Sequence, residues 1–177
     1  LRARSRIVQA AMRSFFPGKG PSRIRWPSTE PATADTDPEV AIKPYLKFYL
    51  LQQADIDSKV RGLHLRTREA VSALSARLAR ICAIDAALGD ALAIQSRRQL
   101  MTVPALLEKR FALLYQNYLD TIEQGTDSRP AWQQTCEQFR RESQGLLLAE
   151  IEARLLPALG LVEALNEETT YEDHAVI

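Results

Sequence analysis

The sequence predicts an all-α fold: an elongated, coiled-coil-like helical bundle with one long helix packed by two shorter antiparallel helices. Alanine and leucine are the commonest residues and aromatic residues make up 7% of the 177 positions, which favours helix over sheet. No proline interrupts residues 45–103, and apolar residues there recur at steps of three and four. Two shorter segments with the same periodicity follow, each with a proline near its start.

Residues 1–16 predict a short basic amphipathic helix. Its arginines would either anchor it on an acidic membrane or nucleic-acid surface, or remain solvated while its apolar side docks on the bundle. We favour docking. Residues 17–43 form a proline-rich linker, and we expect its Trp26 to dock on the protein's own bundle rather than in a partner's pocket. Since the chain begins with Leu1, we expect the native N-terminus to lie upstream.

The long helix is predicted over residues 44–101, with Pro44 in its first turn. Unbroken, it would be about 85 Å long at 1.5 Å per residue. The seam of its second half contains the following residues: Val71, Leu74, Leu78, Ile81, Leu88 and Leu92.

The second and third helices are predicted over residues 105–123 and 131–156, with Asp127 or Ser128 capping the third. Pro157 and Gly160 are expected to kink or end it, and residues 166–177 to form a mobile acidic tail. Residues 44–165 thus form the bundle.

The two shorter helices can cover only residues 72–101 of the long one. Either the long helix breaks and folds back, most plausibly near Gly62, or its apolar first turns bind another chain. The second possibility predicts a partner interface at the following residues: Tyr45, Phe48, Tyr49, Leu51 and Ile56.

Motifs for catalysis are not found. No His or Cys pair has zinc-ligand spacing, and no Gly-rich phosphate loop or nucleophile elbow occurs. We therefore expect a non-enzymatic protein without metal or cofactor. Cys82 and Cys136 are predicted to be free thiols in a reducing, cytoplasmic compartment, although a disulfide between them stays open.

One carboxylate, Asp85, falls in the apolar seam. A buried carboxylate requires a partner, and Arg110 or Arg154 would supply one across the bundle. We interpret Asp85 as a buried polar residue in a structural ion pair, with a role in a switch as the alternative. His64 is interpreted as a surface or packing residue rather than a base.

The net charge of +1 does not indicate nucleic-acid binding, but its distribution is uneven. The first 25 residues contain no acid, and after Arg154 the chain contains no Lys or Arg. If basic residues converged on one face they would contact phosphates, although interleaved acids weaken this interpretation. The candidate contacts are Arg2, Arg4, Arg6, Arg13, Arg97 and Arg98.

The segment Gln-Leu-Met-Thr-Val-Pro-Ala-Leu-Leu-Glu-Lys-Arg-Phe at residues 99–111 resembles a bacterial family of all-helical proteins of unknown function. The similarity extends over residues 44–165. Proteins of this family look like the cytosolic accessory component of type III Zorya anti-phage systems. Those systems pair a flagellar-stator-like proton channel with a peptidoglycan-binding membrane partner and add two soluble proteins. The resemblance supplies no catalytic motif.

The sequence and the resemblance together predict a helical adaptor or effector subunit in bacterial defence. Its expected partners are the companion soluble protein, the cytoplasmic part of the motor, or further copies of itself. A nucleic-acid-binding helical protein is the alternative, and a membrane-surface protein anchored by residues 1–16 is a third hypothesis.

Overall fold

The computed structural model describes residues 2–16, 24–27, 37–125 and 127–175, and these residues contain five helices and no strand. The helices are α1 (Arg2–Ser14), α2 (Pro38–Ser72), α3 (Ala76–Leu100), α4 (Val103–Glu123) and α5 (Ser128–Ala175). The all-α prediction is confirmed. Val176 and Ile177, at the end of the predicted acidic tail, and most of the linker lie outside the described residues.

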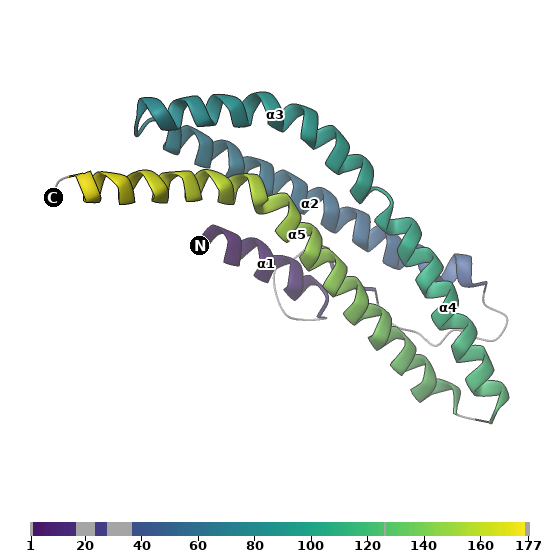
Figure 1. Cartoon of the computed structure of the whole chain (residues 1–177). Helices are drawn as coiled ribbons and strands as arrows, with labels where there is room; N and C mark the ends of the chain where they lie inside the picture. The colour runs from purple at the N-terminus through teal and green to yellow at the C-terminus, as the bar shows by residue number, and fades with distance from the viewer. Residues whose placement is uncertain (1, 17–23, 28–36, 126, 176–177) are drawn as a thin grey trace.

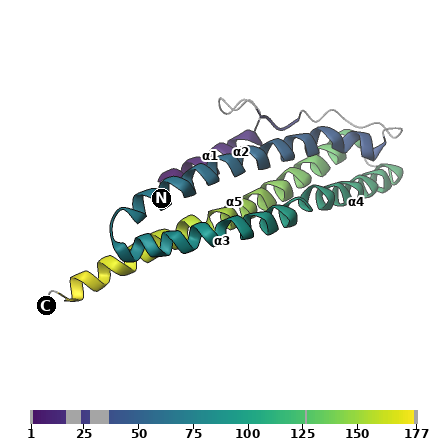
Figure 2. The ribbon, with the colours of Figure 1, turned by 90° about the horizontal axis from the view of Figure 1, so that it is seen from above.

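Three long legs lie side by side. The first is α2, the second is α3 followed end to end by α4, and the third is α5 (Figure 1). The view from above shows α3 and α4 following one another along one side of the molecule, opposite α1 and α2 (Figure 2). The molecule is therefore elongated, with α5 alone about 72 Å long at 1.5 Å per residue for its 48 residues.

The predicted long helix over residues 44–101 is wrong. It is broken at residues 73–75, where the chain reverses, and Gly62 lies inside α2 as an ordinary helical residue. Ser75 begins α3 because its hydroxyl oxygen accepts a hydrogen bond from the backbone nitrogen of Leu78 at 3.1 Å. A helix cap therefore sets the reversal, whereas the glycine was expected to.

The helix α2 also begins earlier than predicted. Asp37 caps it by accepting from the backbone nitrogen of Glu39 at 2.9 Å, and Pro38 takes the first-turn position that we predicted for Pro44. Pro44 lies inside the helix. Pro44 lies beyond the first turn and therefore removes the hydrogen bond that an N–H would donate to the carbonyl of Val40, and the burial of Ile42 and Tyr45 on either side of it offsets this cost.

The turn between α4 and α5 follows the sequence closely. Gly125 has φ +88°, a left-handed conformation that glycine adopts without steric cost, and its nitrogen bonds to the carbonyl of Ile122 at 3.0 Å. Asp127 caps α5, with its Oδ1 accepting from the backbone nitrogen of Arg129 at 3.1 Å. The prediction of Asp127 as a cap is confirmed.

The third helix does not end near Pro157. In the structure α5 continues through Pro157 and Gly160 to Ala175, so the predicted boundary at residue 156 is wrong and residues 166–175 are helical. The physical reason is packing: Ala158 and Leu161 are buried beyond the proline. Burial against neighbouring helices outweighs the lost backbone hydrogen bond.

The main core lies between α1, α2, α4 and α5, and it contains aromatic rings from α2, α4 and α5 together with those of Phe15 and Trp26. Phe15 and Trp26 insert into it, with the Trp26 ring centroid 5.0 Å from that of Tyr45 and 5.1 Å from that of Phe48. Docking of both the N-terminal helix and Trp26 on the protein's own bundle is therefore confirmed. A second, smaller core contains Val71, Leu78, Cys82 and Leu161.

Candidate functional site

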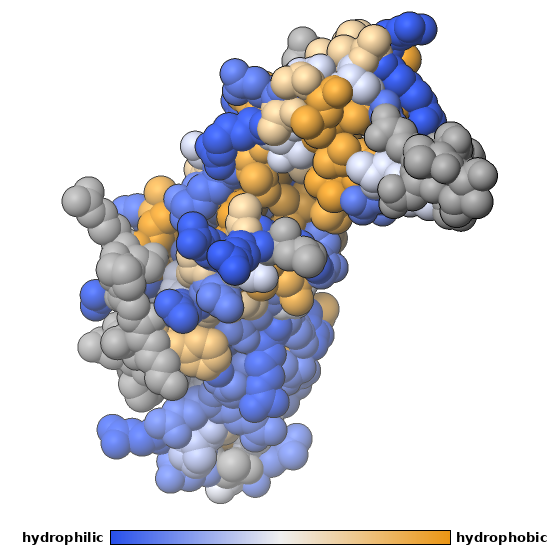
Figure 3. All heavy atoms as spheres, turned by 90° about the vertical axis from the view of Figure 1, so that its left-hand side faces the viewer, coloured by the Kyte–Doolittle hydropathy of each residue, from blue (hydrophilic) through white to orange (hydrophobic). Residues whose placement is uncertain are grey.

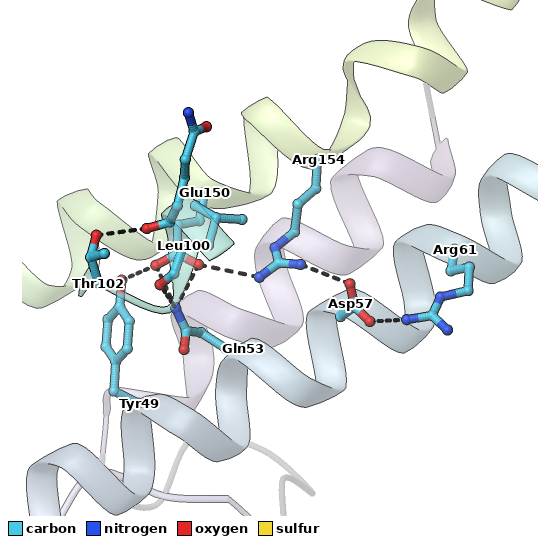
Figure 4. A network of polar contacts seen from close by, with 9 residues as sticks. Tyr49, Gln53, Asp57, Arg61, Leu100, Thr102, Glu150 and Arg154 are labelled. Carbon is cyan, nitrogen blue, oxygen red and sulfur yellow. Dashed lines mark hydrogen bonds and ion pairs between the residues drawn. The ribbon is translucent and has the colours of Figure 1, made fainter. Parts of the chain in front are cut away.

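A buried carboxylate, Glu150 of α5, lies where α2 and the end of α3 approach it (Figure 4). The residue is 5% exposed. Its Oε1 accepts from the Tyr49 hydroxyl at 2.8 Å, and both of its oxygens lie 2.9 Å from Nε2 of Gln53. The same Nε2 donates to the carbonyl oxygen of Leu100, the last residue of α3, at 3.1 Å. One acid therefore joins three helices at the elbow between α3 and α4.

A row of alternating charges continues from Glu150 along α2 and α5. Arg154 Nη2 lies 3.5 Å from Glu150 Oε2, and its Nη1 lies 2.8 Å from Asp57 Oδ1. Asp57 also pairs with Arg61, one turn further along α2. The side chain of Arg154 is only 11% exposed, so its charge needs both carboxylates. The row is electrostatically compensated and ties α5 to α2.

The Tyr49 hydroxyl can donate its hydrogen bond to Glu150 only while it keeps its proton. Burial, and then the negative charge of Glu150 and its hydrogen bond, raise the pKa of Tyr49 well above its ordinary value of 10.0, while Arg154 opposes the shift. The phenol therefore keeps its proton near neutral pH and acts as a donor to the carboxylate. The geometry is that of a structural hub.

The sequence interpretation missed this cluster. Glu150 is not among the candidate residues that the sequence predicts. The available signal was an acid on a buried stripe with Arg154 one turn later, which is the spacing of an intrahelical ion pair.

Asp85 has partners that differ from those predicted. Its Oδ2 lies 2.9 Å from His64 Nε2 and accepts from Arg68 Nε at 2.8 Å, so both partners come from α2. Arg110 instead pairs with Glu142. The correction has a topological reason: the reversal at residues 73–75 brings α3 back along α2. The Asp85 side chain is 18% exposed, which makes it half-buried rather than buried.

The two cysteines are free and buried, as predicted. Cys82 donates to the carbonyl oxygen of Arg68 at 3.5 Å in the second core. Cys136 lies 3.9 Å from the Tyr45 hydroxyl in the main core, and burial raises its pKa to about 11. They occupy different cores, which rules out the disulfide alternative in this fold.

The predicted partner interface at the start of α2 is wrong. Tyr45, Phe48, Tyr49 and Ile56 are each at most 6% exposed because α1, α4 and α5 cover them, and only Leu51 is exposed. The chain folds back and buries this aromatic end itself. The argument that these residues await another chain therefore loses its physical basis.

Exposed apolar surface lies instead at the other end of the molecule. Figure 3 shows hydrophobic side chains gathered at the end that carries the α2–α3 turn and the C-terminal half of α5. We call this end of the molecule, with α3 and the C-terminal half of α5, the arm. We define the arm face by five aliphatic residues of α3 and α5 that are 38–63% exposed: Ile84, Leu88, Leu92, Leu159 and Val162. Half-buried Ile81 and Leu165 link these residues to the second core.

The predicted nucleic-acid contacts are all exposed, but they lie on two separate elements. Arg2, Arg4, Arg6 and Arg13 are on α1, and Arg97 and Arg98 are in the last turn of α3. Arg4 lies 3.3 Å from Glu152.

Three further arginines, on α4 and α5, form ion pairs with acidic residues. Arg140 and Arg141 both pair with Glu137, and Arg110 pairs with Glu142 through two contacts of 2.7 Å. Hydrogen bonds from these arginines lower the pKa of Glu137 and of Glu142. Since the acids neutralise the arginines locally, this part of the surface is not a continuous basic patch.

Within the described part of the chain, no group of three or more His, Cys, Asp or Glu side chains is placed to hold a metal ion. None of the helices there is both long and apolar enough to cross a membrane.

The fold and its polar clusters define an all-helical protein in which buried charges join the legs and one end exposes an apolar face. The chain belongs to a family described as protein of unknown function (DUF3348), whose model matches residues 1–167. The match includes α1 and the linker, which our sequence resemblance over residues 44–165 had left out. No curated protein and no solved structure matches the chain.

Proposed function

We propose that this chain is a non-enzymatic helical adaptor or effector subunit of a bacterial anti-phage defence complex that works with a stator-like proton-channel motor. The defence setting rests on the resemblance of residues 99–111 to the accessory component of type III Zorya systems. The partners are the companion soluble protein and the cytoplasmic part of the motor.

The observation that supports a binding role is the arm face. Leu88 and Leu92 are 55% and 63% exposed, although they continue the same apolar periodicity that buries Leu78. The five side chains together expose on the order of 400 Å² of apolar surface, which is the size of the largest apolar patch on a typical soluble monomer, and such a patch is often functional. The support for a binding role thus moves from the aromatic end of α2 to the arm.

Co-purification tests the proposal. The tagged full chain is expressed with its companion soluble protein and, separately, with the cytoplasmic part of the motor, and each is expected to be retained. Leu88→Glu is expected to reduce retention, while Leu113→Glu, at a 60% exposed leucine of α4 outside the arm face, leaves it unchanged. Failure of the wild-type chain to retain either partner would refute the proposal.

Nucleic-acid binding stays as the alternative because the arginines of α1 are exposed. It requires an affinity for duplex DNA or RNA that falls steeply as salt rises, since released counterions drive such binding. Absence of binding at low salt would dismiss it.

A further inference from the structure

We infer that the arm face is covered by a second copy of this chain, with α3 and α5 of each copy forming a four-helix assembly. The inference deepens the proposed function, on which it rests in one respect: the arm face is a binding surface. It names a second copy of the chain as the occupant of that face, so the defence partners bind the paired chains, and Leu88→Glu reduces their retention by separating the pair.

The arm is built like half of a bundle. The antiparallel helices α3 and α5 contact each other through the second core, where Leu78 and Cys82 meet Leu161, and α2 adds Val71 to the same core. Beside this contact Leu88 and Leu92 of α3 and Leu159 and Val162 of α5 remain exposed. A pair of antiparallel helices with an apolar face is completed by another such pair, because four-helix bundles bury their apolar stripes between facing helices.

The charges of the arm favour one arrangement of two copies. The part of α3 near Leu78 carries exposed Arg77 and Arg80. The part of α5 near Leu161 carries exposed Glu163 and Glu167. Contacts within the second core place these two parts at the same level along the arm.

A two-fold axis parallel to the helices would place α3 of each copy against α5 of the other. Each residue would keep its position along the helix axis. Arg77 and Arg80 of one copy would then face Glu163 and Glu167 of the other, and this would happen twice. Neighbouring helices would all be antiparallel. The surface is therefore self-complementary in charge.

The competing arrangement, in which α3 packs on α3, is disfavoured by charge. Arginines flank the apolar residues of α3 at both ends, with Arg77 and Arg80 before them and Arg97 and Arg98 after them. Antiparallel pairing of α3 with α3 would place Arg77 and Arg80 of one copy near Arg97 and Arg98 of the other. Parallel pairing would bring each cluster against itself, and like charges in contact oppose association.

The mass of the full chain in solution tests the inference. Sedimentation equilibrium and light scattering at micromolar concentrations are expected to give a dimer. Leu88→Glu is expected to give a monomer with an unchanged circular dichroism spectrum, since the side chain is already 55% exposed. The matched control Leu113→Glu is expected to stay dimeric.

A charge exchange tests the arrangement. Arg77→Glu with Arg80→Glu is expected to weaken the dimer at least about tenfold, which corresponds to about 1.4 kcal/mol. Glu163→Arg with Glu167→Arg is expected to do the same. Mixing the two variants in equal amounts is expected to restore association in a heterodimer.

Three results would overturn the inference: a monomeric wild-type chain, a dimer that is unaffected by Leu88→Glu, or exchange variants that do not associate with one another. The fate of the proposed function is separate. A monomer that still retains its defence partner would refute only the second copy, whereas a dimer that retains no partner would refute only the adaptor role.

Discussion

At the residue scale, Glu150 contacts more polar side chains than any other residue described above. Tyr49, Gln53 and Arg154 all direct polar hydrogens at its carboxylate. A buried carboxylate without such partners would take up a proton or destabilise the folded protein, because desolvation of an unpaired charge costs several kcal/mol. Its surroundings explain why an acid is tolerated on a buried helical stripe.

Replacing Glu150 by alanine is expected to lower the free energy of unfolding by about 3 kcal/mol, since the substitution removes the acceptor of the buried Tyr49 hydroxyl and one of the two carboxylates that pair with Arg154. Urea denaturation followed by circular dichroism measures the change. The control is Glu152→Ala, two residues away on the exposed side of α5, which is expected to cost less than about 0.5 kcal/mol. Equal losses for the two variants would contradict the role assigned to Glu150.

The buried phenol of Tyr49 predicts a loss of stability in alkali. Its pKa is raised in the folded state above the ordinary 10.0, so the folded protein holds this proton more tightly than the unfolded chain. The stabilisation is complete below pH 10.0 and is lost as pH rises toward the folded pKa. Above the ordinary value, Tyr49 contributes a slope of about −1.4 kcal/mol per pH unit to the free energy of unfolding.

Tyr49→Phe removes that contribution. Urea titrations at several pH values above 10.0 are expected to show a shallower slope for the variant than for the wild type, even though the variant starts from lower stability at neutral pH. Parallel slopes would show that Tyr49 ionises without resistance in the folded protein. Tyr118→Phe, at a second buried tyrosine, serves as a comparison.

At the scale of the element, the reversal between α2 and α3 determines the whole arrangement. Residues 73–75 are enough to turn the chain, and Ser75 satisfies one of the free N–H groups of α3. Without this turn, Asp85 would not meet His64 and Arg68. The short connection therefore converts the predicted long helix into two antiparallel helices.

Ser75→Ala is expected to cost about 1 kcal/mol of stability because the cap of α3 is lost. Thermal and urea unfolding measure the effect. Ser96→Ala, at an exposed position inside the same helix, is the matched control and is expected to be neutral or slightly stabilising, since alanine is the better helix former. A neutral Ser75→Ala would mean that the turn is held by packing alone.

At the scale of the whole molecule, the two cores differ in size and the arm is the less protected part. Among the described residues, α3 buries only Leu78 and Cys82, whereas the shorter α4 buries Leu107, Phe111, Leu114, Tyr115 and Tyr118. Local opening is easiest where few apolar contacts hold an element. Three of the five residues of the arm face, Ile84, Leu88 and Leu92, lie on this weakly held helix, so a partner would stabilise it directly.

Hydrogen exchange is expected to reflect this difference. Amides of residues 84–99 are expected to exchange at least about tenfold faster than those of residues 107–118 after correction for intrinsic rates. Raising the protein concentration is expected to slow exchange in α3 of the wild type and to leave Leu88→Glu unchanged. Uniform protection along α3 and α4 would contradict the two-core description.

The sequence by itself determined the helical class and the helix predicted at residues 105–123, which the structure begins at Val103. It also offered Asp127 as one of two caps and favoured docking of the apolar side of α1, and both are seen in the structure. These features depend on local chemistry: periodicity, capping residues, and a proline or glycine at a turn. The free state of both cysteines also followed from the sequence, since their apolar helical surroundings predict burial.

The tertiary structure alone decided where the chain reverses, what covers the aromatic start of α2, and which charges pair. A three-residue break carries little signal in a run of good helix formers, because the cost of interrupting the helix is repaid by packing between segments distant in sequence. The same packing extends α5 past Pro157 and brings Gln53, Leu100 and Glu150 together from three helices. Such contacts depend on the relative placement of whole helices, which periodicity within one segment does not encode.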